Sequence, residues 1–234
     1  MKGIDEMAID FKKLTKQMSD PEWIKQQEKK REEERRTFEE SEKIRHKTVC
    51  FTGHRPQKLG GYDMKNPTML KLKEKLLEVI EILIEENECE RFITGGALGA
   101  DTAAFWCVHI MKKKYPHIKN IVAVPFENQD KKWSAEQQAW YRKMLDKADE
   151  VINVDEIEKY KDNTVPNGEY SVAKLSRRNE YMVDHSKDIV AIYDGSKSGT
   201  SNCLYYAHNR YLGHGIWRLS PQYDFDLEVY YTPS

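Results

Sequence analysis

The sequence predicts an α/β fold in which a parallel sheet is covered by helices on both faces, with a charged helical arm in front of it. Two observations predict the sheet. Six short apolar runs alternate with longer amphipathic segments between residues 48 and 219, and strands that alternate with helices require a parallel sheet. A third observation predicts the arm, because more than half of residues 1–47 are charged.

The arm is predicted to be a helical extension over residues 1–46, followed by a domain over residues 47–234. Its first part carries apolar residues at alternating spacings of three and four, which form one helical stripe: Ile4, Met7, Phe11, Leu14 and Met18. Such a stripe is exposed unless something covers it, so we expect residues 4–18 to pack on another subunit, on a partner or on the body of the same chain. We expect a homo-oligomer, for which residues 4–18 are a candidate interface. A solvated tail is the alternative. Asp20 and Pro21 then predict the start of a second helix.

The elements of the domain follow from short runs rich in Val and Ile, which are typical of buried strands, and from apolar residues at helical spacing between them. Asn66 before Pro67, and Ser134 with Gln137, are signals for the start of a helix. The predicted strands lie at residues 48–52, 91–94, 121–125, 151–154, 189–193 and 215–219. The predicted helices lie at residues 67–83, 100–114, 134–145, 171–184 and 201–212.

The composition limits the partners. Lys and Arg number 38 and Asp and Glu 39, so the formal net charge is -1. That balance predicts that nucleic acid is an unlikely partner and gives no attraction to an anionic membrane. No apolar run approaches the ~20 residues that span a bilayer, and no signal-peptide pattern opens the chain. The four cysteines lie far apart without metal-ligand spacing. We therefore expect a cytoplasmic protein with reduced thiols and no bound metal.

A glycine-rich turn follows the predicted strand at 91–94. Gly95 and Gly96 come directly after the strand, and Gly99 precedes a helical segment that begins at Ala100. Glycines let a backbone approach a phosphate closely, and the N-terminus of the following helix faces the anion. The turn therefore predicts a phosphate site that Asp101 borders. The alternative is that the glycines only shape a tight turn.

A second turn of the same kind, at Asp194, Gly195, Gly199 and Thr200, follows the predicted strand at 189–193. Two such turns at the carboxyl ends of strands can hold the two ends of a nucleotide. Further polar residues stand where ligands bind in α/β folds, or on the helix at 171–184. They are Gly53, His54 and Arg55 after the first strand, and Arg178 and Asn179 on the helix. A surface salt bridge is the alternative for Arg55.

Several of these segments, in the same order, resemble the YpsA-like branch of the SLOG superfamily. They are Thr52-Gly53-His54-Arg55-Pro56, Thr94 to Asp101, Val124-Pro125-Phe126, Arg178-Asn179 with Met182-Val183-Asp184, and Tyr193-Asp194-Gly195 with Gly199-Thr200. The resemblance covers about residues 47–220. The superfamily also contains the Lonely Guy phosphoribohydrolases and the DNA-processing protein DprA. The resemblance implies a Rossmann-like sheet that binds nucleotides or nucleotide-derived signals, as in the sensing domains of some bacterial immune effectors.

One position departs from the hydrolase pattern. Lonely Guy hydrolases carry Pro-Gly-Gly-x-Gly-Thr-x-x-Glu, in which the acid stabilises the sugar cation formed during cleavage. Here Ser201, Asn202 and Cys203 follow Gly199-Thr200, and we take Asn202 to stand in place of the acid. Arg178 matches the helix arginine of the hydrolases. Asp101 or Asp184 could replace the acid, but we expect Asp101 to orient the glycine turn and Asp184 to pair with an arginine.

We therefore expect a binding protein without catalytic residues, which senses or sequesters a nucleotide, cyclic-nucleotide or ADP-ribose-like signal in bacterial or phage immune signalling and requires no cofactor. The residues expected to hold phosphate are Gly95, Gly96, Gly99, Gly199 and Thr200. Arg55 and Arg178 would supply charge, and Asp194 or Asn202 would contact sugar hydroxyls. One alternative is an N-glycosidase that acts on nucleoside monophosphates. The other is a DprA-like binder of single-stranded DNA, against which the near-neutral charge argues.

Overall fold

The structure is a computed structural model that describes residues 18–234. The apolar stripe predicted for residues 4–18 lies outside the described residues except for Met18, so an oligomer through this stripe stays a prediction. The chain divides into two units, Met1–Lys43 and Ile44–Ser234. The predicted boundary between residues 46 and 47 also stays a prediction.

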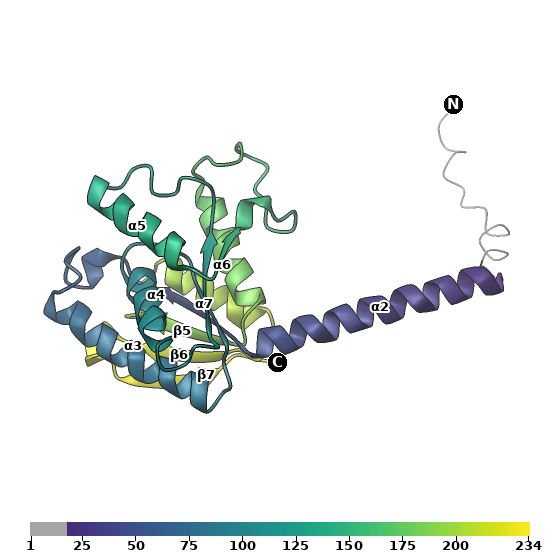
Figure 1. Cartoon of the computed structure of the whole chain (residues 1–234), viewed down its shortest axis with the longest axis horizontal. Helices are drawn as coiled ribbons and strands as arrows, with labels where there is room; N and C mark the ends of the chain where they lie inside the picture. Colours follow the sequence, from purple (N-terminus) through teal and green to yellow (C-terminus); the bar gives the residue numbers. More distant parts are fainter. Residues whose placement is uncertain (1–17) are drawn as a thin grey trace. The chain divides into compact units, whose positions relative to one another are not determined.

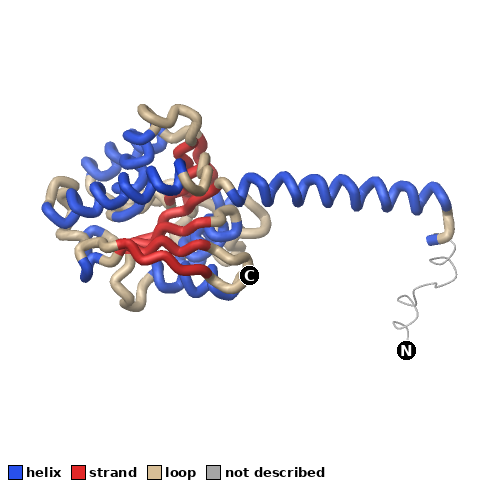
Figure 2. Tube along the Cα trace, turned by 90° about the horizontal axis from the view of Figure 1, so that it is seen from below, coloured by secondary structure: helices blue, strands red, loops and turns tan. Residues whose placement is uncertain are grey.

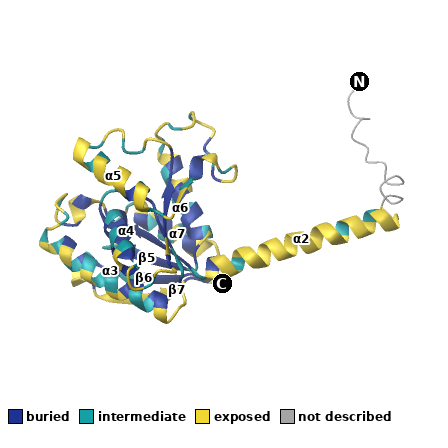
Figure 3. Cartoon of the chain, in the orientation of Figure 1, coloured by how far each residue is buried: buried dark blue, intermediate teal, exposed yellow. Residues whose placement is uncertain are grey.

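The predicted second helix of the arm is confirmed as α2, Pro21–His46. Asp20 begins it, because its Oδ1 accepts a hydrogen bond from the Glu22 N–H at 2.9 Å. The side chains of α2 are mostly exposed (Figure 3). Ion pairs at helical spacing connect them, for example Arg35 with Glu39 at 2.5 Å. Such pairs contribute a few tenths of a kcal/mol each to an exposed helix, so α2 is stabilised mainly along its own length.

The domain contains a seven-stranded sheet (Figure 2). Its strands are β1 Thr48–Gly53, β2 Arg91–Thr94, β3 Lys119–Val124, β4 Glu150–Asn153, β5 Asp188–Ile192, β6 Gly215–Leu219 and β7 Leu227–Tyr231. The order across the sheet is β4-β3-β2-β1-β5-β6-β7. Every neighbouring pair is parallel except β6 with β7, which is antiparallel.

Helices cover both faces of the sheet (Figure 1). One face packs against α3 Pro67–Glu85, α4 Ala100–Met111 and α5 Ala135–Lys147. The other packs against α6 Val172–Asp184 and α7 Gly199–Asn209. Alternation along β1 shows the two layers, because Val49 and Phe51 join the core under α3 and α4 while Cys50 joins the core under α6 and α7. The predicted Rossmann-like α/β fold with helices on both faces is therefore confirmed.

Strand β7 was not predicted. It follows β6 through the short turn η4, Pro221–Tyr223, and pairs back on β6 as a hairpin. The prediction assumed that a helix separates consecutive strands, which holds for parallel neighbours but not for a hairpin. All five residues of β7 are exposed, so the strand also lacks the signal of a buried apolar run.

The order of the strands determines where a ligand can bind. The chain passes from β1 to β2 on one side, whereas β5 lies on the other side of β1. The loops after β1 and β5 therefore leave the sheet toward opposite faces and open a crevice at their carboxyl ends. All four cysteines are buried and free. Within residues 18–234, no helix is both long and apolar enough to cross a membrane.

We expect acid to destabilise the domain through His214, which is fully buried before β6. Burial lowers the pKa of His214 to about 4, and the nearby charge of Arg45 acts in the same direction. The unfolded chain binds a proton near pH 6.5 but the folded domain does not, so stability falls as the pH drops from about 6.5 to 4.

The loss at pH 4.5 should be roughly 2–3 kcal/mol relative to neutral pH. Urea unfolding of the intact protein and of a His214→Gln variant at both pH values measures it. The variant should lack this part of the pH dependence. Equal pH dependence in the two proteins would contradict the assignment to His214.

Candidate functional site

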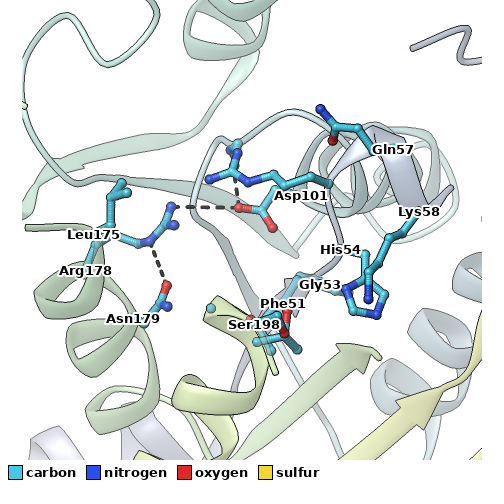
Figure 4. Close-up of a pocket in the computed structure, with 15 residues that line it drawn as sticks. Phe51, Gly53, His54, Gln57, Lys58, Asp101, Leu175, Arg178, Asn179 and Ser198 are labelled. Atoms are coloured by element: carbon cyan, nitrogen blue, oxygen red, sulfur yellow. Dashed lines mark hydrogen bonds and ion pairs between the residues drawn. The ribbon is translucent and has the colours of Figure 1, made fainter. Parts of the chain in front are cut away.

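A cavity of about 330 Å³ lies at the crevice between β1 and β5 (Figure 4). Five segments line it: the end of β1 with its following residues 51–55, the turn η2 (Pro56–Lys58), the residues after β2, one face of α6 and the start of α7. The lining residues are Phe51, Thr52, Gly53, His54, Arg55, Gln57, Lys58, Ala97, Asp101, Leu175, Arg178, Asn179, Ser198, Gly199 and Thr200. Eight of the fourteen residues predicted from the sequence are among them.

Arg178 places a buried cation at this cavity. Its residue is 5% exposed, and its Nε donates a hydrogen bond to Asn179 Oδ1 at 3.0 Å. Its Nη1 donates to the Gly95 carbonyl oxygen and lies 3.8 Å from Asp101 Oδ2. Burial lowers the pKa of Arg178, and the Asp101 carboxylate opposes that shift. An arginine stays charged in proteins, so the cavity holds a fixed charge that Asp101 neutralises only in part.

Gly95 provides the space for this guanidinium. A Cβ at position 95 would lie 1.6 Å from Arg178 Nη1 and 2.2 Å from its Cζ. Asp101 holds the same turn, because its Oδ2 accepts a hydrogen bond from the Ala97 N–H at 3.2 Å. The expectation that Asp101 orients the glycine turn is confirmed. The absence of a side chain at Gly95 therefore admits Arg178, a role that the sequence did not suggest.

The other two glycines of the first turn also serve packing. Gly96 has φ +65°, and a Cβ there would lie 3.0 Å from Val122 Cγ1, away from the cavity lining. Gly99 has φ +101°, and a Cβ there would lie 2.6 Å from the His54 carbonyl oxygen. That carbonyl accepts the Ala100 N–H at 3.1 Å. Gly95, Gly96 and Gly99, which we expected to hold phosphate, do not line the cavity.

The second turn is held by Asp194. Its carboxylate accepts hydrogen bonds from the Lys58 ammonium group at 2.7 Å and from the Ser196 N–H at 2.9 Å. Burial raises the pKa of Asp194, but the hydrogen bonds from Lys58 and Ser196 outweigh burial and hold that pKa well below its usual range. Asp194, expected to contact sugar hydroxyls, and Gly195 beside it do not line the cavity. The carboxylate joins the turn after β5 to η2.

His54 completes this connection. It is buried, and burial lowers its pKa. Its Nε2 lies 2.9 Å from the backbone nitrogen of Asp194 and 2.8 Å from Oδ1 of the same residue. Asp194 therefore engages the Nε2 atom of His54 and ties the loop after β1 to the loop after β5.

The start of α7 offers hydrogen-bond donors to the cavity. Ser198 and Ser201 form a capping box, in which the Ser198 hydroxyl accepts the Ser201 N–H at 3.3 Å. The N–H groups of Gly199 and Thr200 have no acceptor within the helix. A Cβ at Gly199 would meet nothing within 4 Å, so this backbone faces open space. Helix N-termini of this kind bind anions.

The assignment of Asn202 to the position of the hydrolase acid requires a correction. Two residues separate Gly-Thr from the acid in the hydrolase motif, so the acid position after Gly199-Thr200 is Cys203. Thr200, Cys203 and Ala207 form the buried face of α7, whereas Asn202 is exposed, and neither Asn202 nor Cys203 lines the cavity. Cys203 lies beside Thr52, and burial raises the pKa of its thiol to about 11. It supplies no carboxylate either.

Asp101 is the one carboxylate among the residues that line the cavity. Asp184 lies elsewhere and accepts hydrogen bonds from Tyr160 at 2.7 Å and Lys159 at 2.6 Å. It also pairs with Arg210 at 2.8 Å, so the expected partnership with an arginine is confirmed.

Some lining residues were not predicted. Leu175 precedes Arg178 by three residues and so shares its face of α6, which is a signal that the sequence contains. Gln57 and Lys58 follow Pro56 in an exposed turn and give no such signal. Among the described residues, no tyrosine or tryptophan lines the cavity. Of the aromatic residues in the nearby loops, Phe126 packs against Tyr170, Trp133 packs against Tyr141, and Tyr62 accepts a hydrogen bond from Gln57.

Two glycines that line the cavity, Gly53 and Gly199, differ in how closely they are packed. The packing therefore predicts that substitution by alanine destabilises the protein at Gly53 but not at Gly199. A Cβ at Gly53 would lie 2.5 Å from Ala100 Cβ and 2.8 Å from Ile192 Cβ, whereas a Cβ at Gly199 meets nothing. We expect Gly53→Ala to lower the free energy of unfolding by about 1–3 kcal/mol. Gly199→Ala should change it by less than about 0.5 kcal/mol. Urea denaturation measures both, and equal losses would contradict the packing.

Two solved structures have a related arrangement of elements. DNA processing protein A (DprA) from Streptococcus pneumoniae matches with a TM-score of 0.48 and 16% identity, over 73% of this chain and 49% of that one. DprA from Helicobacter pylori matches with a TM-score of 0.44 and 16% identity, over 73% of this chain and 64% of that one. This chain thus spans less than two thirds of either protein.

The prediction that nucleic acid is an unlikely partner was wrong. Both neighbours are DNA-processing proteins, and the H. pylori protein is described by its single-stranded DNA binding mode. The prediction relied on the net charge, which sums over the whole chain, whereas binding depends on local charge. Arg55, Lys58 and Arg178 gather at one cavity despite the net charge of -1. At 16% identity the likeness itself shows the fold alone.

Sequence comparisons are more specific. A family model described as "YspA SLOG family" (YpsA) matches residues 49–215. The "Uncharacterized SPbeta prophage-derived protein YoqJ" of Bacillus subtilis is 64% identical over 168 residues, which are 72% of this chain and 98% of that protein. A UPF0398 protein of Brevibacillus brevis is 31% identical over 68% of this chain and 78% of its own length. The chain belongs to the YpsA SLOG family.

Proposed function

We propose that the cavity binds a nucleotide or a nucleotide-derived signal through its phosphate and does not cleave it. The observation that carries this proposal is the buried guanidinium of Arg178 in a cavity that the N-terminus of α7 also lines. A charge-assisted hydrogen bond to each of these groups contributes about 1.5–3 kcal/mol. An anion is the ligand that satisfies both.

The charges around the cavity favour the same ligand. Arg55, Lys58 and Arg178 line it together with the single carboxylate of Asp101. Asp194 neutralises Lys58, whereas the 3.8 Å separation between Arg178 and Asp101 leaves their pairing incomplete. Desolvated charges attract a counter-charge more strongly than exposed ones do. A phosphate at this position would complete the partnership of Arg178.

The size of the cavity supports a small ligand. Its volume of about 330 Å³ lies at the lower end of the roughly 300–1,000 Å³ of small-molecule sites. Its walls combine these polar groups with the apolar side chains of Phe51, Ala97 and Leu175. We therefore place one phosphorylated nucleoside, or one such half of a larger signal, in the cavity.

Binding without hydrolysis follows from the carboxylates. Cleavage of an N-glycosidic bond passes through a cation-like state that a nearby carboxylate stabilises. The α7 position of the hydrolase acid holds Cys203, and Asp101 is engaged by the Ala97 N–H beside Arg178. Loss of that stabilisation raises the barrier by several kcal/mol, or roughly a thousandfold in rate. A nucleoside-monophosphate N-glycosidase is the alternative function.

Such a binding protein senses or sequesters its ligand. The relative YoqJ is described as prophage-derived, and this supports the part of the proposal that places the ligand in phage-related immune signalling. The proposal requires no cofactor.

The proposal predicts that Arg178→Ala weakens binding of a phosphorylated ligand. Calorimetry with AMP, ADP-ribose and 3′,5′-cyclic AMP, with a labelled single-stranded oligonucleotide alongside, identifies the ligand class. For the probe that binds, we expect a loss of roughly 30- to 150-fold, the equivalent of about 2–3 kcal/mol.

Arg177→Ala is the matched control, because Arg177 is the exposed neighbour of Arg178 and pairs with Glu180 at 2.7 Å. It should leave the affinity unchanged. An equal loss in both variants, or binding of the oligonucleotide alone, would contradict the proposed site.

We also expect no release of free adenine from AMP or ADP-ribose at an enzymatic rate. Chromatography of the incubated protein measures it, with Asp101→Asn as the comparison because Asp101 is the lining carboxylate. Robust turnover that Asp101→Asn abolishes would show that Asp101 performs the role of the missing acid and that the protein is a hydrolase.

A further inference from the structure

The outer edge of β7 is an unpaired strand with an apolar surface. β7 ends the sheet (Figure 1), so within the described residues only β6 pairs with it. All five of its residues are exposed. On one face lie Leu227, Val229 and Tyr231, which are 39%, 43% and 71% exposed. Long, exposed, apolar edges are rare because other strands add to them.

The register identifies which backbone groups are free. The Thr232 N–H donates to the His214 carbonyl oxygen at 2.9 Å, and the His214 N–H donates to Thr232 Oγ1 at 2.8 Å. These two residues adjoin the ends of β7 and β6, so their backbone groups face each other as a hydrogen-bonded pair. Hydrogen-bonded and non-hydrogen-bonded pairs alternate along an antiparallel ladder. The N–H and C=O groups of Leu227, Val229 and Tyr231 therefore point outward. Pro233 has no N–H, and its carbonyl oxygen accepts a hydrogen bond from the Gly213 N–H at 2.9 Å, so the free edge ends before it.

The charges of the edge do not protect it. The opposite edge strand, β4, has four residues and begins with Glu150, which pairs with Arg91. β7 carries a single charge, Glu228, and its carboxylate is neutralised by Arg218 of the neighbouring strand at 2.9 Å. β7 lacks the lysines, prolines and inward charges with which edge strands exclude a partner.

We propose that a second copy of this chain adds to the β7 edge in antiparallel orientation, about a two-fold axis at Val229. In that register Val229 lies opposite the partner's Val229, and Leu227 lies opposite the partner's Tyr231. All three outward residues of each copy then exchange backbone hydrogen bonds. The assembly closes at two copies, because each copy has one such edge and the pairing is isologous.

Charge and backbone chemistry select this register among the neighbouring ones. An axis at Glu228 would bring two carboxylates together, which is destabilising. An axis at Tyr230 would place Leu227 opposite the partner's Pro233, which cannot donate a hydrogen bond. The axis at Val229 places Glu228 opposite the partner's Tyr230 and avoids both conflicts. The edge is therefore complementary to itself and requires no other partner.

Substitution of Val229 tests the proposal in the full-length protein, because a residue on the axis meets its own copy. Light scattering over a dilution series should show a dimer for the unmodified protein. Val229→Glu and Val229→Lys should each weaken dimerisation by roughly tenfold or more, since each places like charges opposite one another. A mixture of the two variants should dimerise again, because Glu then faces Lys.

Val151→Glu is the matched control. Val151 lies on the other edge strand, β4, and is 47% exposed, so the substitution adds the same charge at a similar edge position. It should leave the dimer unchanged. A monomeric unmodified protein, a dimer that survives both Val229 variants, or a mixture that stays monomeric would each overturn the proposal. So would a dimer that only Phe11→Glu dissolves, because the arm would then be the interface.

A cross-link keeps the test independent of whether charged variants fold. Residues of a hydrogen-bonded antiparallel pair have Cα atoms about 5.5 Å apart, which suits a disulfide. Mild oxidation of Val229→Cys should therefore yield a covalent dimer. The four native cysteines are buried, so Val151→Cys serves as the control for random collision. Equal cross-linking of the two variants would overturn the proposal.

Discussion

The contact between Arg178 and Gly95 holds the candidate site together. A guanidinium from α6 enters the turn after β2 at the one position where a side chain would collide with it. Arg178 Nη1 and Nε are fixed by the Gly95 carbonyl and by Asn179, and Nη2 is the atom that would meet the ligand in the proposed site. A lysine has no planar fork and could not hold the turn and a ligand together. Arg178 also connects the two helical layers across the end of the sheet, because its Nη1 lies 3.8 Å from Oδ2 of Asp101, in the first turn of α4 on the opposite face.

The strand order makes this contact possible. β1 and β5 are neighbours whose following loops leave toward opposite faces, so residues from both layers converge beyond their carboxyl ends. His54, Lys58 and Asp194 then join the loop after β1 to the loop after β5. These bonds use the carboxylate and the imidazole for structure. The groups that remain for a ligand are the cation of Arg178 and the first N–H groups of α7.

The sequence predicted the six parallel strands, the five helices of the domain and the start of α2 at Asp20 and Pro21. These elements depend on local periodicity and on helix caps. It located both glycine turns and Arg178. It could not assign their roles, since the clash that keeps position 95 free of a side chain involves a residue 83 positions away. Asn202 was misplaced by one position, which the burial of Cys203 reveals. β7 was missed because it pairs with β6 as a hairpin, with no helix between the two strands, and because its residues are exposed.

These placements change what the glycines imply about function. Glycine-rich turns in α/β folds suggest a backbone that cradles phosphate. In the first turn, however, a side chain would collide with other parts of the protein: with the Arg178 guanidinium at Gly95, with Val122 at Gly96 and with the His54 carbonyl oxygen at Gly99. Of these glycines and Gly199, only Gly199 faces open space. In the proposed site, recognition of an anion therefore shifts from the first turn to the start of α7, and Arg178, which the first turn positions, supplies the positive charge. The first turn would then act on the ligand through Arg178.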